Sequence, residues 1–112
     1  NILPFALSVE VLKKDNHFKF STDDKTIHLD ADKLSFPLTV RKWKKGDSFQ
    51  PLGMKQTKKI SDYLIDKKIN LFDKEKIYVM LSQNEIAWLV GQRIDDRYKI
   101  TSQTKNILEF RL

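Results

Sequence analysis

The chain of 112 residues has no cysteine, and it has only three glycines and three prolines. The absence of cysteine excludes a disulfide scaffold, a thiolate zinc site and a cysteine nucleophile, and it suits the reducing cytoplasm. No apolar run approaches the roughly 20 residues that a membrane-spanning helix needs, so we expect no membrane span. The first residues lack the charged-then-apolar order of a signal peptide. The chain begins with Asn1 rather than methionine, and we expect it to be a processed chain or a piece of a longer protein.

Catalytic and metal-binding patterns are also missing from the sequence. The glycines lie far apart and form no phosphate-binding loop, and no serine lies in a Gly-x-Ser-x-Gly elbow. His17 and His28 match no common metal spacing, so we interpret them as polar strand residues. Asp30 and Asp32 could share acid–base work or hold a cation, but turn residues surround them, which favours solvated loop positions. The sequence therefore predicts no catalytic residue, no metal site and no cofactor in this chain.

Composition and periodicity predict one small α+β domain over residues 1–112, mainly of antiparallel strands. Forty per cent of the residues are hydrophobic and 11% are aromatic, which is enough for a core. Alternating apolar residues predict a meander of three strands at the start of the chain and further strands later. The predicted strands cover residues 7–12, 17–21, 26–30, 38–43, 77–82, 85–90, 98–101 and 107–112.

One definite helix is predicted near residues 58–67. Ile60, Tyr63 and Leu64 fall at i, i+3 and i+4, which places them on one helix face. Thr57 can cap the start of this helix, and two lysines fall in its last turn. Residues 46–54 hold a Gly-Asp turn signal, a proline and a second glycine, so they cannot form a regular element. A short helical turn is expected at residues 73–76.

Positive charge is concentrated in one stretch of the sequence. The net charge of the chain is +6, and residues 41–68 carry nine Lys and Arg against three Asp. The two flanking regions are close to neutral. A concentrated patch of one sign creates a local field that attracts anions, whereas an even scatter would only aid solubility. We call residues 41–68 the basic segment.

Two interpretations of the basic segment are open at this point. Lysines and Arg41 could neutralise phosphates while Trp43 stacks on a base or a ribose. Alternatively, this is an edge strand whose lysines prevent aggregation, with Trp43 in the core. Lys58 and Lys59 favour a ligand, because positive charge at a helix start opposes the helix dipole and free backbone N–H groups there bind phosphate.

The basic segment resembles the C-terminal domain of the tRNA(Ile)-lysidine synthetase family. The matching stretches, in the same order, are VRKWKKGDSFQPLGM at 40–54, KKISDYLIDKKI at 58–69, IAWLVGQRID at 86–95 and YKIT at 98–101. The resemblance is strongest over residues 38–101, and residues 1–37 match loosely as the β-rich start of the same domain. The family often has a glycine where this chain has Gln56, so the loop is expected to be less sharply bent here.

The resemblance implies a β-rich, sandwich-like module, similar to a domain of phenylalanyl-tRNA synthetase, that docks on the acceptor stem of a tRNA. The family's full enzyme is a ligase that uses ATP with Mg to attach lysine to the wobble cytidine of an isoleucine tRNA with a CAU anticodon. That chemistry belongs to an N-terminal domain with a Ser-Gly-Gly-x-Asp-Ser loop, which this chain lacks. The expected partners are this tRNA and the enzyme's own N-terminal domain. The alternative is a protein-interaction module whose basic patch docks an acidic partner surface.

The resemblance and the residue chemistry together assign roles within the chain. Arg41 is the first candidate for reading a base edge and Arg93 the second, because a guanidinium fork bonds in a bidentate way. Trp88 is assigned to the core. The three Asp of the basic segment are expected to position cations or cap turns. The residues expected to contact RNA are Arg41, Lys42, Lys44, Lys45, Lys55, Lys58, Lys59, Lys67 and Arg93, and those expected to shape the loop are Gly46, Pro51 and Gly53.

Overall fold

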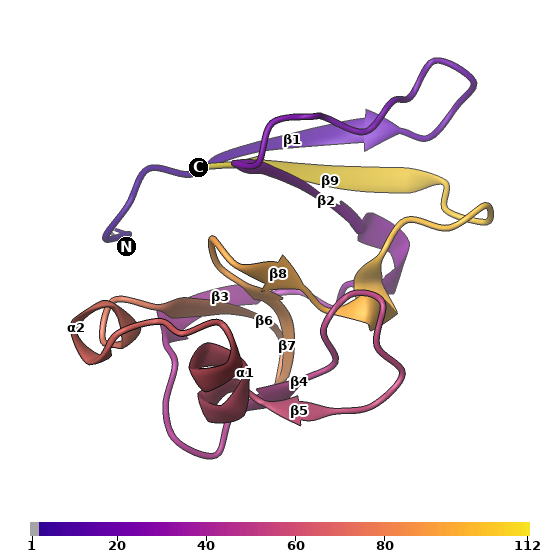
Figure 1. The fold of residues 1–112 in the computed structure, drawn as a ribbon. Helices are drawn as coiled ribbons and strands as arrows, with labels where there is room; N and C mark the ends of the chain where they lie inside the picture. Colours follow the sequence, from indigo (N-terminus) through magenta and orange to yellow (C-terminus); the bar gives the residue numbers. More distant parts are fainter. Residues whose placement is uncertain (1–2) are drawn as a thin grey trace. The chain divides into compact units, whose positions relative to one another are not determined.

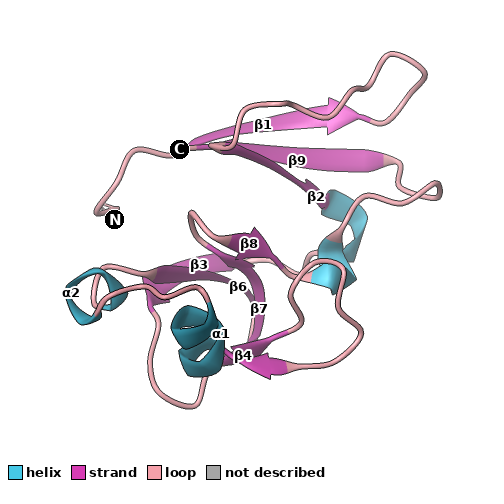
Figure 2. Cartoon of the chain, in the orientation of Figure 1, coloured by secondary structure: helices cyan, strands magenta, loops and turns pink. Residues whose placement is uncertain are grey.

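The computed structural model describes residues 3–112, which form two compact units (Figure 1). One unit combines the N-terminal residues up to Leu34 with Tyr98–Leu112, and the other is Ser35–Arg97. Both are built mainly of antiparallel strands, which confirms the predicted fold class (Figure 2). Among the described residues, no helix is long and apolar enough to cross a membrane.

The first unit is a three-stranded antiparallel sheet in the order β1-β9-β2. The C-terminal strand therefore lies between the two N-terminal strands, and the predicted meander is wrong. Its central place follows from apolar pairing, since Leu108 lies opposite both Val11 and Leu29 in the register. The strands of this sheet are β1 (Ser8–Lys13), β2 (Thr26–Asp30) and β9 (Asn106–Arg111).

Two predicted strands of this unit are absent from the structure. Residues 17–21 form no strand, and the rings of Phe18 and Phe20 pack edge-on against His28, at centroid distances of 5.2 and 5.7 Å. Their alternation reflects this aromatic cluster rather than a sheet. Residues 98–101 begin at the last residue of a 3-10 turn, η2 (Asp96–Tyr98), and lead into a tight turn rather than a strand.

His28 and Asp30, which were considered as possible metal-binding or acid–base residues, have structural roles in this unit. His28 is buried in β2, as a strand residue, and its Nε2 lies 3.0 Å from Glu109 Oε1. Asp30 is buried rather than solvated, so the loop interpretation is wrong for this residue. Its carboxylate caps a second 3-10 turn, η1 (Ala31–Lys33), and accepts a hydrogen bond from the hydroxyl of Thr104. The turn residues around Asp30 suggested a loop, and nothing in the local sequence indicates its hydrogen bond with Thr104.

The second unit holds a four-stranded antiparallel sheet in the order β3-β6-β7-β8, together with a two-stranded ribbon, β4-β5. The tight hairpin between β6 and β7 turns at Gln83, which adopts a positive φ of 54°. This hairpin matches the predicted pair of strands. The strands are β3 (Leu38–Lys42), β4 (Ser48–Phe49), β5 (Lys58–Lys59), β6 (Tyr78–Ser82), β7 (Glu85–Leu89) and β8 (Arg93–Ile94).

The predicted helix is confirmed as α1 (Ile60–Asp66), which packs over this sheet (Figure 1). Its buried face is the predicted one: Ile60, Tyr63 and Leu64 join a core cluster with Phe49 of β4 and residues of β6 and β7. Trp88 is buried, as assigned. A second helix, α2 (Leu71–Lys74), replaces the expected turn two residues earlier.

The start of α1 differs from the prediction. The N-cap is Lys59, with no side-chain cap, and Thr57 lies outside the helix. Lys58 and Lys59 belong to β5, where pairing with β4 keeps their backbone extended. The first helical N–H, that of Ile60, donates to the carbonyl oxygen of Asp47 at 3.0 Å, which takes the place of a side-chain cap.

Leu64→Ala should lower the free energy of unfolding by about 2–5 kcal/mol, because it leaves a cavity in the cluster under α1. Its neighbour Ile65, with 60% of its surface exposed, is the matched control. Ile65→Ala should change stability by less than about 0.5 kcal/mol. Urea denaturation of both variants measures the difference, and equal losses would contradict the assigned helix face.

Candidate nucleic-acid interface

The whole basic segment lies within the second unit, and a buried carboxylate organises its first loop. Arg41 of β3 donates from Nη1 to Asp47 Oδ2 at 2.9 Å and from Nη2 to Oδ1 at 3.0 Å. The backbone N–H of Lys44 donates to the same carboxylate at 2.8 Å. The Arg41–Asp47 pair therefore closes the turn that presents Lys44 and Lys45.

This pairing also sets the protonation of Asp47. Burial raises the pKa of its carboxyl, but the hydrogen bonds from Arg41 and the Lys44 N–H outweigh burial, and the net pKa is below the usual 3.8. The hydrogen bonds to Asp47 raise the pKa of Arg41. Both groups are charged at neutral pH, so the turn is held by a charge-assisted bidentate pair.

A second buried carboxylate, Asp95, organises the next part of the loop. Asp95 is 0% exposed and accepts from the Gln50 N–H at 2.8 Å and from the Nε and Nη2 of Arg97 at 2.9 and 2.8 Å. Asp96 accepts from the Gly53 N–H at 3.0 Å. These contacts hold the irregular stretch that contains Pro51 and Gly53, and the φ of 89° at Gly53 lies in the left-handed region that favours glycine.

Asp95, Asp96 and Arg97 have no role among the residues predicted from the sequence. Their loop partners lie more than forty positions earlier in the chain, so no spacing pattern connects them. The local signal is an acidic pair followed by arginine, which begins five residues after the predicted strand 85–90. Such a pair is typical of a local turn anchor, because Asp side chains commonly accept from backbone N–H groups two residues on.

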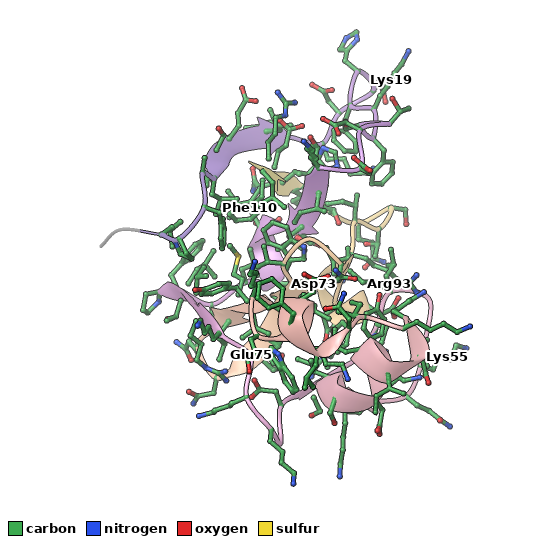
Figure 3. All side chains as sticks on the ribbon, turned by 60° about the vertical axis from the view of Figure 1, so that its left-hand side comes forward. Lys19, Lys55, Asp73, Glu75, Arg93 and Phe110 are labelled. Atoms are coloured by element: carbon green, nitrogen blue, oxygen red, sulfur yellow. The ribbon has the colours of Figure 1, made fainter. Side chains whose placement is uncertain are left out.

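Five of the seven lysines that were predicted to contact RNA are exposed to solvent, and these five make neither an ion pair nor a cation–π contact with any other residue among positions 3–112. Lys55 extends outward from its loop (Figure 3). These lysines form the accessible part of the candidate interface: Lys42, Lys44, Lys45, Lys55 and Lys59.

The remaining predicted contacts are engaged within the fold. Lys58 Nζ pairs with Asp66, and the guanidinium of Arg41 is held by Asp47. The Nζ of Lys67 and the guanidinium carbon of Arg93 lie 5.6 and 5.9 Å from the ring centroid of Tyr63. An RNA group that binds any of these four cations must compete with an internal partner.

The structure also decides the role of Trp43. Its ring packs against the core cluster, and its Nε1 donates to the carbonyl oxygen of Lys74 at 2.6 Å. β3 is an edge strand, and Trp43 next to it is partly buried against the core cluster, which favours the edge-strand interpretation. Lys42, the residue before Trp43, is exposed. Neighbouring residues at this end of β3 therefore face the core and the solvent in turn.

The phosphate site predicted at the helix start is not built as expected. α1 has seven residues, its first N–H is already bonded to Asp47, and Lys58 and Lys59 lie before it. Lys59 is the N-cap and so still lies at the positive end of this short helix, whereas Lys58 is one residue further out and pairs with Asp66. Among the described residues, no group of three or more His, Asp or Glu could hold a metal ion.

The fold and the site together define a class: a small, mainly antiparallel β module with a rigid, lysine-rich loop. The chain belongs to the family described as the TilS substrate C-terminal domain, whose model matches residues 38–110. This confirms the resemblance noted for residues 38–101. A crystal structure of a TilS C-terminal domain aligns over 97% of this chain and 86% of its own, with a TM-score of 0.72 at 20% identity.

Curated relatives are tRNA(Ile)-lysidine synthases. The protein of Parabacteroides distasonis is 43% identical over 105 residues, which cover 94% of this chain, and that of Bacteroides thetaiotaomicron is 39% identical over 98% of this chain. The chain spans about a quarter of the length of these relatives. An N-terminal fragment of the phenylalanyl-tRNA synthetase β-subunit of Pyrococcus horikoshii shares the fold over 76% of this chain and 27% of its own, with a TM-score of 0.60 at 19% identity.

Asp47→Asn should lower the free energy of unfolding at pH 7 by about 1–3 kcal/mol, because it weakens the charge-assisted bonds to Arg41. Because the folded pKa of Asp47 is depressed, its contribution is fully present above pH 3.8 and is lost as the pH falls through the lower folded value. The difference from the unaltered chain should therefore shrink in acid.

Urea unfolding between pH 7 and pH 2 measures this dependence. The exposed Asp62 of α1 provides the control, and Asp62→Asn should lower the free energy of unfolding at pH 7 by less than Asp47→Asn does. A constant difference between the Asp47→Asn variant and the unaltered chain at every pH would contradict the ion pair.

Proposed function

We propose that this chain is the tRNA-binding domain of a tRNA(Ile)-lysidine synthase and that it docks on the acceptor stem of an isoleucine tRNA with a CAU anticodon. The parent would be an ATP-dependent ligase of the cytoplasm that modifies this tRNA by attaching lysine to its wobble cytidine. ATP with Mg and lysine would be used by the N-terminal part of the parent. The sequence of this chain holds no phosphate-binding loop for that chemistry.

The observation that carries the proposal is the exposed lysines on a loop fixed by buried carboxylates. Lys44 and Lys45 lie in the turn closed by Arg41 and Asp47, so the backbone that carries them is held before any ligand binds. A pre-organised cationic loop loses less conformational entropy on binding than a flexible one. Phosphate neutralisation by lysines then supplies affinity through counterion release.

We expect this chain to recognise the shape of the RNA stem rather than its base sequence. An A-form stem has a deep, narrow major groove that side chains read poorly, and it displays phosphates and 2′-hydroxyls along a shallow minor groove. Lysines bind phosphates as point charges and carry no sequence information. Arg41 and Arg93 stay candidates for a base edge, but each would first have to leave Asp47 or Tyr63.

A second candidate function is a protein contact, which the exposed apolar residues of α2 favour. Leu71 is 77% exposed and Phe72 is 69% exposed, although large apolar side chains normally pack inside a domain. The N-terminal part of the parent enzyme is the partner that this surface would meet. RNA binding and this contact involve different residues of the second unit, so they are separable by substitution.

Replacing Lys44 and Lys45 together by Ala should weaken binding of an isoleucine tRNA and lower the slope of log K against log salt by about one to two. Filter binding or fluorescence anisotropy over a salt series measures both quantities. The adjacent pair Lys13 and Lys14 of the first unit is the matched control, because its replacement removes the same charge outside the basic segment.

The lysine pairs separate a local contact from general attraction. A loss confined to the Lys44 and Lys45 variant supports docking through the basic segment. Equal losses for the two pairs would show that only net charge matters, and no loss for either would place the RNA elsewhere. Replacing Leu71 and Phe72 by Ser should leave tRNA binding intact.

A further inference from the structure

The loop between β4 and β5 contains a tight turn at residues 51–54. The N–H of Met54 donates to the carbonyl oxygen of Pro51 at 2.8 Å, and Gly53 adopts a φ of 89°. A glycine with a positive φ at the third of four residues is typical of a type II turn. We call residues 51–54 the Pro51–Met54 turn.

This turn is fastened to β8 and to the segment that follows it. The N–H of Leu52 donates to the carbonyl oxygen of Ile94 at 3.0 Å, and the N–H of Gly53 donates to Asp96 Oδ1 at the same distance. In return, the N–H of Asp96 donates to the carbonyl oxygen of Gln50 at 2.7 Å. The backbone of the turn is therefore held before any ligand binds, so little conformational entropy is lost there on binding.

Two carbonyl oxygens of the held turn are free to accept hydrogen bonds. Those of Pro51 and Met54 already accept from the Met54 N–H and from Nε2 of Gln50. No residue in the described part of the chain donates to the carbonyl oxygens of Leu52 and Gly53, and both residues are exposed. Because a carbonyl oxygen only accepts, a ligand that bonds to these two groups must bring hydrogen-bond donors.

The side chains beside these carbonyl groups are apolar and cationic. Leu52 and Met54 are 41% and 38% exposed, and the next residue, Lys55, extends outward from the loop (Figure 3). A ligand that fits the turn therefore combines hydrogen-bond donors, apolar surface and negative charge. An A-form RNA stem offers all three along its shallow minor groove, as 2′-hydroxyls, ribose C–H groups and the adjoining phosphates.

We propose that the Pro51–Met54 turn reads the minor groove of the tRNA stem by accepting hydrogen bonds from 2′-hydroxyls, and that it thereby selects RNA over DNA. The inference rests on the proposed function, which supplies the stem. Leu52 and Gly53 accept through their carbonyl oxygens, and the side chains of Leu52 and Met54 cover ribose C–H groups. Lys55 neutralises a neighbouring phosphate. The other lysines of the basic segment bind phosphates, which DNA also has, so they do not make this distinction.

A tRNA whose acceptor stem carries 2′-fluoro groups provides the first test. Fluorine keeps the sugar pucker of A-form RNA and leaves the phosphates unchanged, but it does not donate a hydrogen bond. The unaltered chain should bind this tRNA about threefold to tenfold more weakly than the natural tRNA, because the hydrogen bonds to the turn are lost. Fluorescence anisotropy measures both affinities.

Gly53→Ala shows whether that preference belongs to the turn. A Cβ at this position meets no atom within 4 Å, but the positive φ is strained for alanine, so the variant disturbs the turn without a clash. It should bind the natural and the fluorinated tRNA with nearly equal affinity. Gly91→Ala is the matched control, because Gly91 has a φ of 78° and equal space in the turn between β7 and β8. This control should keep the full preference.

The apolar and charged contacts of the turn are separated by their dependence on salt. Replacing Leu52 and Met54 together by Ala should weaken tRNA binding about threefold to tenfold, because apolar contact is lost. The slope of log K against log salt should not change, since an apolar contact releases no counterion. Lys55→Ala should instead lower that slope by about one. Ile65→Ala, which removes exposed apolar surface from α1, should change neither quantity.

Urea denaturation of each variant checks that the fold is retained, and tRNA affinities are compared among folded variants. If Gly53→Ala does not fold, the variant without the Leu52 and Met54 side chains takes its place in the test with fluorinated tRNA. Its preference for the natural tRNA should then be smaller than that of Ile65→Ala, because the ribose contacts that seat the turn in the groove are lost.

The possible results separate this inference from the proposed function. Equal affinity of the unaltered chain for natural and fluorinated tRNA overturns the 2′-hydroxyl contact, even where replacing Lys44 and Lys45 still weakens binding. A preference that every turn variant keeps in full places the reading of 2′-hydroxyls elsewhere and also overturns it. Turn variants that leave tRNA binding intact assign the apolar surface to a protein partner, with the same consequence. Absence of tRNA binding by the unaltered chain overturns the proposed function itself.

Discussion

The candidate site depends on the hydrogen bonds that the carboxylate of Asp95 accepts from Gln50 and Arg97. This carboxylate is fully buried, and its donors are the Gln50 N–H, the Arg97 N–H and the Arg97 side chain. A buried charge is tolerated only when it is paired and hydrogen-bonded, and breaking such a pair is strongly destabilising. Asp95 thus ties the segment after β8 to the loop after β4 and orients Arg97 at the same time.

Asp47 repeats this arrangement at the other end of the loop. It closes the turn after β3 through Arg41 and the Lys44 N–H, and its carbonyl oxygen accepts from the first N–H of α1. Acidic residues therefore build the scaffold, while lysines occupy the exposed positions between the anchors. The excess positive charge is left on the surface, where water and salt screen its self-repulsion until a polyanion arrives.

The parts of the fold that local periodicity specifies were predictable. The i, i+3, i+4 spacing of Ile60, Tyr63 and Leu64 gave the buried face of α1, and the β6-β7 hairpin followed from two alternating runs around a turn. The place of β9 was not predictable, because it pairs with strands about eighty or more positions earlier and only tertiary packing selects them. The strand predicted at residues 17–21 is wrong, because Phe18 and Phe20 alternate with polar residues while packing in an aromatic cluster.

The candidate site divides in the same way. The exposed lysines and the loop-shaping glycines were evident from charge and turn residues in one segment. The ion pair between Arg41 and Asp47 was not predictable, because a run of cations does not indicate which one faces a carboxylate six residues later. The roles of Asp95 and Arg97 depend on a loop more than forty positions away, so only the folded chain shows them.

The most direct test of the account is a footprint of this chain on an isoleucine tRNA. Hydroxyl-radical cleavage of the RNA backbone, with and without the chain, reports which riboses are covered. The account predicts protection of consecutive riboses in the acceptor stem, and loss of that protection when Lys44 and Lys45 are replaced by Ala. Protection confined to the anticodon arm, or protection that survives the loss of these lysines, would contradict it.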